Sequence, residues 1–363
     1  MDMKKTSLQY AEQSLATMMR INAEDLPPKG RFHYHQGVFL RGMQMIYEIT
    51  NDEKYFDYIK RWVDSVIDEN GNVKCMQKDE LDDIQAGNLL YFLYDKTNDE
   101  RYMTAIKALI GLLENWKKNE KGGFWHKDRH PDQMWLDGIY MASPFMAEYA
   151  RRTNNAEFYE EVEKQTDLMN TYLKDEKTGL FFHGWDCSKK VHWCDKETGR
   201  SPEKWGRAMG WYTMAMLDIM ENYPPESEKR KLFAENERSI INALLKFRDS
   251  GSKVWYNIVD KGGMEGNFLE ASCTCLYVYS LCKGVRMGVL DDSFKETARE
   301  SYDGVMKLMR EDASGDFFVS NVVIGTGIDN FAYYASVPRN ENDLHGVGAF
   351  LMMCAEYYKL FGE

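Results

Sequence analysis

The sequence lacks any apolar run long enough to cross a bilayer, and it lacks a basic tract. No window approaches the roughly 20 consecutive apolar residues that a membrane-spanning helix needs. Residues 1–19 contain no continuous apolar segment of the kind that marks a signal peptide. The net charge of -12 disfavours nucleic acid and anionic membranes as partners. We therefore expect a cytoplasmic protein that binds neither nucleic acid nor a membrane.

Several common functional motifs are also missing. The chain has no P-loop, no GxGxxG and no Gly-x-Ser-x-Gly segment, so nucleotide binding and α/β-hydrolase chemistry have no support. Seven cysteines, an odd number scattered over the chain, fit free thiols in a reducing cytoplasm better than a disulfide framework. Cys273 and Cys275 would point to opposite sides of a helix, which favours packing over a redox role.

What the chain has in abundance is apolar residues with helical spacing. Hydrophobic residues make up 44% of the sequence and aromatic residues 13%, which is enough for a large core. Residues 50–52 and 153–155 each end one helix and cap the next, because their short polar side chains can accept hydrogen bonds from first-turn amides. Apolar periodicity predicts twelve helices, over residues 8–20, 36–50, 54–68, 83–95, 99–116, 134–153, 155–174, 203–222, 227–249, 269–288, 292–310 and 343–361.

A short glycine- and aromatic-rich stretch recurs between pairs of these helices. The stretches are residues 71–73, 123–126, 179–183, 253–256 and 315–319. Their spacing of about 50 to 75 residues is typical of a repeat architecture. An open solenoid would fit the same period, but capping repeats are not evident, and six helical hairpins can close into a ring. We therefore predict an all-α protein, a single (α/α)6-barrel domain over residues 1–363.

In such a ring, the loops between hairpins gather at one mouth, where aromatic rings and fixed polar groups could bind sugars. The aromatic residues of the recurring stretches have a simpler interpretation, as packing beneath the loops, and this interpretation is favoured for Phe124, Phe181, Trp255 and Phe317. Packing explains the polar side chains of His126 and His183 less well.

Asp137 is the strongest candidate for catalysis. It ends the dense polar and aromatic cluster of residues 122–138 (GGFWHKDRHPDQMWLDG) and lies beside Trp135 at the start of an apolar helix. A carboxyl group held against an indole in a poorly hydrated pocket has a raised pKa and can donate a proton near neutral pH. The alternative is an ordinary first-turn acid, whose pKa the helix dipole would lower.

Two further clusters could line the same cleft. In residues 81–87 (LDDIQAG), one of Asp82 and Asp83 would cap a helix and the other would face the cavity. In residues 205–211 (WGRAMGW), the planar guanidinium of Arg207 between two indoles would suit a carboxylate. The alternatives for Arg207 are a surface cation–π cluster or a salt bridge to an acid such as Asp137.

One further set of residues carries side chains of the kind that bind metals. His183, Cys187, His192 and Cys194 could supply four zinc ligands, but their spacing matches no compact zinc pattern. We therefore expect no metal.

Together these clusters resemble family 105 of the glycoside hydrolases, the unsaturated rhamnogalacturonyl hydrolases. The resemblance extends from residues 32–38 (FHYHQGV) to residues 342–346 (NDLHG). Its most specific stretches are residues 81–87, 122–138, 183–186, 201–211 and 267–272. Several motifs in the same order are stronger evidence than any one of them.

The resemblance implies an (α/α)6 barrel that removes a 4,5-unsaturated galacturonyl group from rhamnose, the unit left by rhamnogalacturonan lyases during pectin degradation. In that family, the acid matching Asp137 protonates the vinyl-ether double bond at C4, and water then adds at C5. The resulting hemiketal rearranges and releases the neighbouring sugar. This chemistry implies no metal and no other cofactor.

The resemblance also implies roles for the other residues. Asp82 would position the sugar or the water, and the sugar subsites would be lined by His126, Trp135, His183, Trp205, Arg207 and Trp211. Arg129, His130 and Gly184 lie in loops where variation is expected, so the leaving-group sugar is less well defined than the unsaturated uronide. We expect a monomer or a weak dimer.

Three alternatives remain open from the sequence. The related family 88 performs the same hydration on unsaturated glycosaminoglycan disaccharides, and its sulfated substrates would call for extra basic residues near the cleft. A sugar epimerase of the same fold would use a histidine pair, for which His126 and His183 are available. A non-catalytic helical toroid would bind sugars at its mouth without turnover.

Overall fold

The computed structural model describes residues 5–74 and 76–363. In this part of the chain there are thirteen α-helices, and twelve of them correspond to the predicted ones. The additional helix is the short α12 (Phe331–Ser336). The other twelve are α1 (Ser7–Ile21), α2 (Tyr34–Thr50), α3 (Glu53–Val66), α4 (Asn88–Thr97), α5 (Glu100–Glu114), α6 (Gly138–Thr153), α7 (Ala156–Leu173), α8 (Gly206–Glu221), α9 (Glu228–Leu245), α10 (Ala271–Arg286), α11 (Phe294–Met306) and α13 (Leu344–Phe361).

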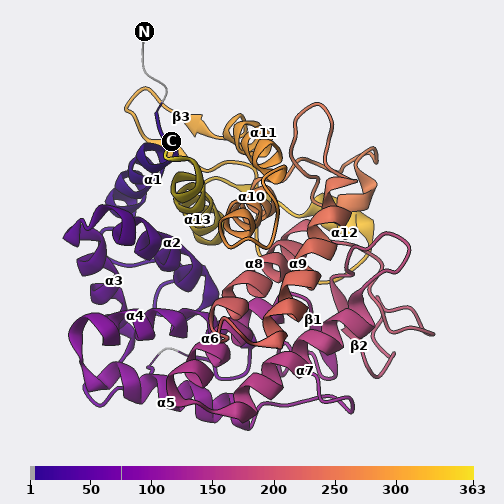
Figure 1. The fold of residues 1–363 in the computed structure, drawn as a ribbon, viewed down its shortest axis with the longest axis horizontal. Helices are drawn as coiled ribbons and strands as arrows, with labels where there is room; N and C mark the ends of the chain where they lie inside the picture. Colours follow the sequence, from indigo (N-terminus) through magenta and orange to yellow (C-terminus); the bar gives the residue numbers. More distant parts are fainter. Residues whose placement is uncertain (1–4, 75) are drawn as a thin grey trace.

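Six helix pairs are arranged in a ring (Figure 1). Five of them are hairpins of consecutive helices, and the sixth joins α1 with α13. An inner circle of α2, α4, α6, α8, α10 and α13 is surrounded by α3, α5, α7, α9, α11 and α1, each packed against its inner partner. The ring closes because α13 packs against both α10 and α2. At the closure, the Ser7 hydroxyl donates a hydrogen bond of 2.7 Å to the carbonyl of Glu363. The predicted (α/α)6 barrel is confirmed.

The turns within three hairpins, at residues 50–52, 97–99 and 153–155, have the same backbone conformation and the same kind of helix cap. In each, an asparagine with φ of 52° to 53° ends the first helix in the left-handed conformation. The next residue, aspartate or asparagine, caps the following helix by accepting a hydrogen bond from an amide two residues on. Such caps satisfy amides that have no partner within the helix. The predicted caps at residues 50–52 and 153–155 are therefore confirmed.

The loops between hairpins contain short antiparallel strand pairs. β1 (Gln133–Trp135) pairs with β2 (Gly184–Asp186), β3 (Arg310–Glu311) with β4 (Phe317–Phe318), and β5 (Val322–Val323) with β6 (Arg339–Asn340). The other recurring stretches form isolated bridges, such as Lys118 with Phe124 and Lys174 with Phe181. Each of the five recurring stretches therefore contributes to a strand pair or a bridge, and none of them is helical. Phe124, Phe181, Trp255 and Phe317 are all buried in the core, as the packing interpretation required.

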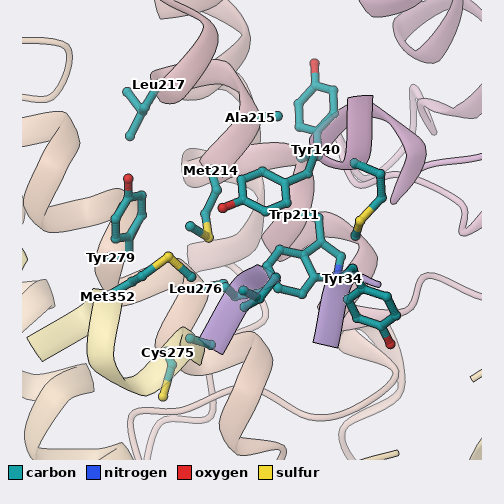
Figure 2. Close-up of a cluster of buried hydrophobic side chains, with 14 of the residues drawn as sticks. Tyr34, Tyr140, Trp211, Met214, Ala215, Leu217, Cys275, Leu276, Tyr279 and Met352 are labelled. Carbon is teal, nitrogen blue, oxygen red and sulfur yellow. The ribbon is translucent and has the colours of Figure 1, made fainter. Parts of the chain in front are cut away.

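An apolar layer of buried side chains lies between the inner helices (Figure 2). At its centre Trp211, on α8, is 1% exposed and stacks on Tyr140 of α6, with ring centroids 4.9 Å apart. Met214, Leu276 and Tyr34 belong to the same cluster (Figure 2). Burying aromatic and branched side chains from several inner helices in one layer holds those helices in register.

Among the described residues, no helix is both long enough and apolar enough to span a membrane.

Candidate active site

A cavity of about 280 Å³ lies at the end of the ring where the inner helices begin. Six of the eight predicted site residues line it: Asp82, His126, Trp135, Asp137, Trp205 and Arg207. The other two do not line the cavity. His183 is fully buried behind Asp137, which it contacts, and Trp211 lies in the apolar layer. Residues that the sequence did not single out also line the cavity: His33, Tyr34, His35, Lys127, Met141 and residues 325–327.

The cavity is suited to an anion although the chain as a whole is acidic. Its walls carry the side chains of Lys127, Arg129 and Arg207 against the two carboxyl groups of Asp82 and Asp137. The first turns of α2, α6 and α8 also face it, and helix N-termini carry partial positive charge and free amides. A small molecule with a carboxylate group fits this arrangement.

A larger cavity of about 530 Å³ lies toward the opposite ends of the inner helices. None of the eight predicted site residues lines it. Many of its charged groups are paired with each other, as in the contacts of Arg152 with Asp95 and Glu148 at 2.6 Å. The smaller cavity is therefore the candidate active site.

Asp137 lies immediately before α6, directly after the strand pair of β1 and β2. Its side chain is 11% exposed, and its Oδ2 lies 3.1 Å from Nε2 of His183. Burial alone would raise the pKa of Asp137, but His183, with a smaller contribution from His126, outweighs burial and lowers it. The predicted raised pKa is therefore wrong for the empty site. Trp135 does lie close by. The contact between His183 and the carboxyl group joins two separate loops, and no local pattern in the sequence indicates it.

His183 is held between Asp137 and Tyr334. Its Nδ1 lies 2.6 Å from the Tyr334 hydroxyl, and its ring is 4.6 Å from that of Trp205. Burial lowers the pKa of His183 more than Asp137 raises it, so the imidazole is neutral at neutral pH. Tyr334 was not predicted, because the six-residue α12 is too short to show helical periodicity.

Three aromatic rings form one wall beside Asp137. His126 and His130 both stack on the indole of Trp135, with ring centroids 4.7 Å and 5.3 Å away. Their positions follow from the loop that leads into β1, where the His126 amide donates to the carbonyl of Gln133. The predicted grouping of His126 and Trp135 around the acid is present.

Asp82, rather than Asp83, is the acid that faces the cavity. Burial would raise the pKa of Asp82, but Lys127 at 2.5 Å and His126 at 3.3 Å hold it well below its usual range. Asp83 instead accepts a hydrogen bond of 2.7 Å from the amide of Gln77, and burial raises its pKa to about 6.

Glu80 is a buried acid that sequence reasoning missed. It contacts Arg31 at 2.6 Å, Lys127 at 3.0 Å and Arg129 at 3.1 Å. It therefore anchors the cations at the rim of the cavity. The signal was present, since Glu80 directly precedes the acidic segment that contains Asp82, but a glutamate before a helix is too common to stand out.

Arg207 is 1% exposed and lies over the Trp205 ring, 4.5 Å from its centroid. Its guanidinium donates to the backbone carbonyls of Val323 and Ile324, the latter at 2.7 Å, and contacts Nε2 of His345 at 2.7 Å. Within the described part of the chain it forms no ion pair with a carboxylate, so the proposed salt bridge to Asp137 is not present. Its charge therefore remains available to an anion in the cavity.

Among the residues that the structure describes, two groups of side chains meet the distance requirement for a metal ion, namely His35, Asp343 and His345, and His33, Glu80 and Asp82. Each already has a cation against it, because Arg207 contacts His345 and Lys127 contacts both acids of the second group. These cations would repel a metal ion. Neither group includes Cys187 or Cys194, and His192, whose side chain is 75% exposed, pairs with Asp329.

Comparison with known proteins decides the family. The sequence profile described as Glycosyl Hydrolase Family 88 matches residues 7–361. The chain belongs to glycosyl hydrolase family 88. This family 88 protein is a glycoside hydrolase, and the resemblance to family 105 is confirmed by a similar solved structure. That structure, a family 105 glycoside hydrolase from C. acetobutylicum ATCC 824, has a TM-score of 0.93 and 35% identity, covering 97% of this chain and 99% of that one.

More distant relatives match this chain over most of its length. The unsaturated rhamnogalacturonyl hydrolase YesR of Bacillus subtilis is 24% identical over 330 residues, which is 89% of this chain and 88% of YesR. The unsaturated glucuronyl hydrolase of Bacillus sp. GL1 has a TM-score of 0.74 at 13% identity, covering 98% of this chain and 97% of that one. The second likeness is one of fold alone.

Proposed function

We propose that this family 88 enzyme removes a 4,5-unsaturated uronic acid from the end of a short oligosaccharide, with Asp137 as the proton donor. The observation that carries this proposal is the difference between the ion-pair partners of the two carboxyl groups in the cavity, those of Asp82 and Asp137. Asp82 is tied to Lys127, whereas Asp137 has no lysine or arginine within ion-pair distance among the described residues. A carboxyl group whose nearest partner is a neutral imidazole can be protonated much more easily than one beside an ammonium group.

The reaction begins with transfer of the Asp137 proton to C4 of the vinyl ether, which leaves positive charge at C5 and the ring oxygen. Water adds at C5, and its surplus proton passes to the Asp137 carboxylate, which restores the acid. The hemiketal then opens, and the neighbouring sugar leaves from C1. General acid catalysis of this kind benefits from a carboxyl group in a poorly hydrated pocket, and the Asp137 side chain is only 11% exposed.

Binding of the substrate would supply the missing step, which is protonation of Asp137. A uronate carboxylate in the cavity adds a negative charge near Asp137, and a like charge disfavours the ionised form of a carboxyl group. We assign Arg207 to this carboxylate, because its guanidinium lines the cavity without an acidic partner. The pKa of Asp137 would then rise on binding, whereas it is lowered in the empty site.

The remaining predicted residues receive roles that match their positions. Asp82 would bind sugar hydroxyls or the attacking water, and His126, Trp135 and Trp205 would form the walls of the sugar subsite. His183 would act behind Asp137, and Trp211 would support the site from the apolar layer.

For the substrate we propose an unsaturated galacturonyl group linked to rhamnose. Support comes from the motifs shared with family 105 and from the similarity to YesR, which is named as an unsaturated rhamnogalacturonyl hydrolase. The alternative, an unsaturated glucuronyl group on a glycosaminoglycan-type disaccharide, is supported by the fold shared with the Bacillus sp. GL1 enzyme. Assaying both disaccharides with one preparation distinguishes these substrates.

The test of the proposed function is the ultraviolet absorbance of the conjugated double bond. Incubation with unsaturated galacturonyl-rhamnose is expected to remove this absorbance, and Asp137→Asn is expected to abolish the loss while the circular dichroism spectrum stays unchanged. Near-normal turnover by Asp137→Asn would overturn the proposal. Binding of the disaccharide by the wild-type protein without turnover would instead indicate a non-catalytic toroid.

A further inference from the structure

Tyr334 is a buried tyrosine whose hydroxyl group has one side-chain hydrogen-bond partner, His183. The residue is 0% exposed, and its hydroxyl lies 2.6 Å from Nδ1 of His183. The backbone amide of Asp329 also acts on this hydroxyl as a hydrogen-bond donor, which leaves Nδ1 of His183 as its acceptor among the described residues. The α12 backbone holds the ring in place, because the Tyr334 amide bonds to the carbonyl of Asn330 and its carbonyl accepts from Asn257.

This contact determines where the proton of His183 resides. Burial raises the pKa of Tyr334 well above its ordinary value, so the phenol keeps its proton and donates it to the one acceptor in reach, Nδ1 of His183. A neutral imidazole that accepts at Nδ1 carries its own proton on Nε2. That nitrogen lies 3.1 Å from Oδ2 of Asp137, and neither atom has an aligned hydrogen-bond partner in the empty site.

We propose that Tyr334 is a positioning residue that fixes the tautomer of His183 and thereby controls the protonation of Asp137. The inference rests on the proposed function, since it concerns the proton that Asp137 transfers. An Nε2–H group facing Asp137 stabilises the carboxylate that remains after C4 has been protonated. Contacts of this kind are often poorly aligned in an empty site and tighten when substrate binds.

Other charged groups face the same residues. His126 and Asp82 act on Asp137, Arg207 acts on His183, and Glu203 acts on Tyr334. A Tyr334→Phe substitution changes none of these groups. It removes only the hydroxyl, so that His183 is free to carry its proton on Nδ1 and to turn an unprotonated Nε2 toward Asp137. The pKa of Asp137 should then rise.

The matched experiment compares Tyr334→Phe with Tyr212→Phe. Tyr212 is also 0% exposed and loses an equivalent hydrogen bond, of 2.7 Å to Asn170, on another part of the barrel. If activity requires protonated Asp137, kcat/KM falls as pH rises through the pKa of that group. In Tyr334→Phe we expect this falling limb to move to higher pH by about half a unit to one unit, with little change in KM. Tyr212→Phe should leave the limb unchanged.

Two measurements make the outcome independent of turnover. Carbon NMR of aspartate carboxyl groups, with Asp137→Asn for assignment, should show the same upward shift for Asp137 in Tyr334→Phe. Nitrogen NMR of histidine in the wild-type protein should show His183 protonated on Nε2. An Nδ1-protonated His183, or an unchanged Asp137 titration in a folded Tyr334→Phe protein, would overturn the inference. Turnover by Asp137→Asn would overturn the proposed function instead, so the two failures are distinct.

Discussion

Oδ2 of Asp137 lies 3.1 Å from Nε2 of His183, and this contact sets the protonation state of the site. The two residues are brought together by the pairing of β1 with β2, in which Trp135 is opposite Gly184. The amide of Leu136 also donates to the carbonyl of His183 at 2.8 Å. The short strand pair of β1 and β2 thus places the neutral imidazole of His183 against the buried carboxyl group of Asp137.

Replacing Arg207 should weaken substrate binding more than it slows chemistry. Arg207→Gln removes the positive charge that we assign to the uronate, so we expect KM to rise about tenfold or more with a smaller change in kcat. Steady-state kinetics on the unsaturated disaccharide measure both. Arg230→Gln is the control, because Arg230 also donates to two backbone carbonyls, those of Met220 and Tyr223, but lies outside the cavity. An unchanged KM for Arg207→Gln would remove Arg207 from carboxylate binding.

Substitutions of the two neighbouring acids should have different effects. Replacing Asp82 should mainly lower activity, whereas replacing Asp83 should mainly lower stability. Asp82→Asn alters a group in the cavity, and we expect kcat to fall at least about a hundredfold, by the removal of a group that positions the reactants. Asp83→Asn weakens a buried contact to the Gln77 amide, and we expect a loss of about 1–3 kcal/mol in the free energy of unfolding with kcat largely kept. Kinetics and urea unfolding of both variants measure these effects. A fully active Asp82→Asn enzyme would contradict the assignment.

Lys127 should contribute to stability in a pH-dependent way. It contacts both Glu80 and Asp82, whose pKa values are lowered in the folded protein. Carboxylates with lowered pKa values stabilise the fold above the unfolded-state pKa of about 4, and this contribution disappears as pH falls. We expect Lys127→Met to cost about 2–4 kcal/mol of unfolding free energy at pH 7 and less at pH 4.

The control for Lys127→Met is Lys117→Met. Lys117 pairs with Asp128 on the surface, its side chain is 55% exposed, and such pairs contribute at most about 1 kcal/mol. Equal losses for Lys127→Met at pH 7 and pH 4 would show that packing, rather than the charge pairs, accounts for the effect.

Trp211 should behave as a core residue. Trp211→Leu removes a stacked, fully buried indole, and we expect the free energy of unfolding to fall by about 2–4 kcal/mol while KM stays nearly constant. Trp205→Phe alters the cavity wall and should raise KM. A large rise in KM for Trp211→Leu without loss of stability would contradict this role and indicate that Trp211 contacts the sugar.

The sequence predicted the architecture because the signals for it are local. Apolar spacing and the caps at residues 50–52 and 153–155 depend on neighbours within a few positions, and they identified twelve helices and the closed ring. The six predicted residues that line the cavity were identified from local clusters of polar and aromatic residues and from the family resemblance that those clusters carry. The extent of the single domain, the oligomeric state and the location in the cell stay predictions.

The details that failed depend on contacts between distant segments. Whether Trp211 faces the cavity or the core depends on the packing of α8 against α6, which periodicity does not specify. The pKa of Asp137 depends on His183 and, through it, on Tyr334, which are brought in by separate loops. Glu80, His33, His35 and His345 likewise reach the site or its cations only when distant segments come together in the closed ring.

The most direct test of proton transfer from Asp137 to C4 is proton NMR of the wild-type reaction in deuterium oxide, recorded within the first turnovers. The account predicts a released uronic acid without a double bond that carries one deuterium at C4, delivered to a single face, and no such product from Asp137→Asn. Release of a free uronic acid whose double bond is still intact would place the reaction at the anomeric carbon and contradict the account.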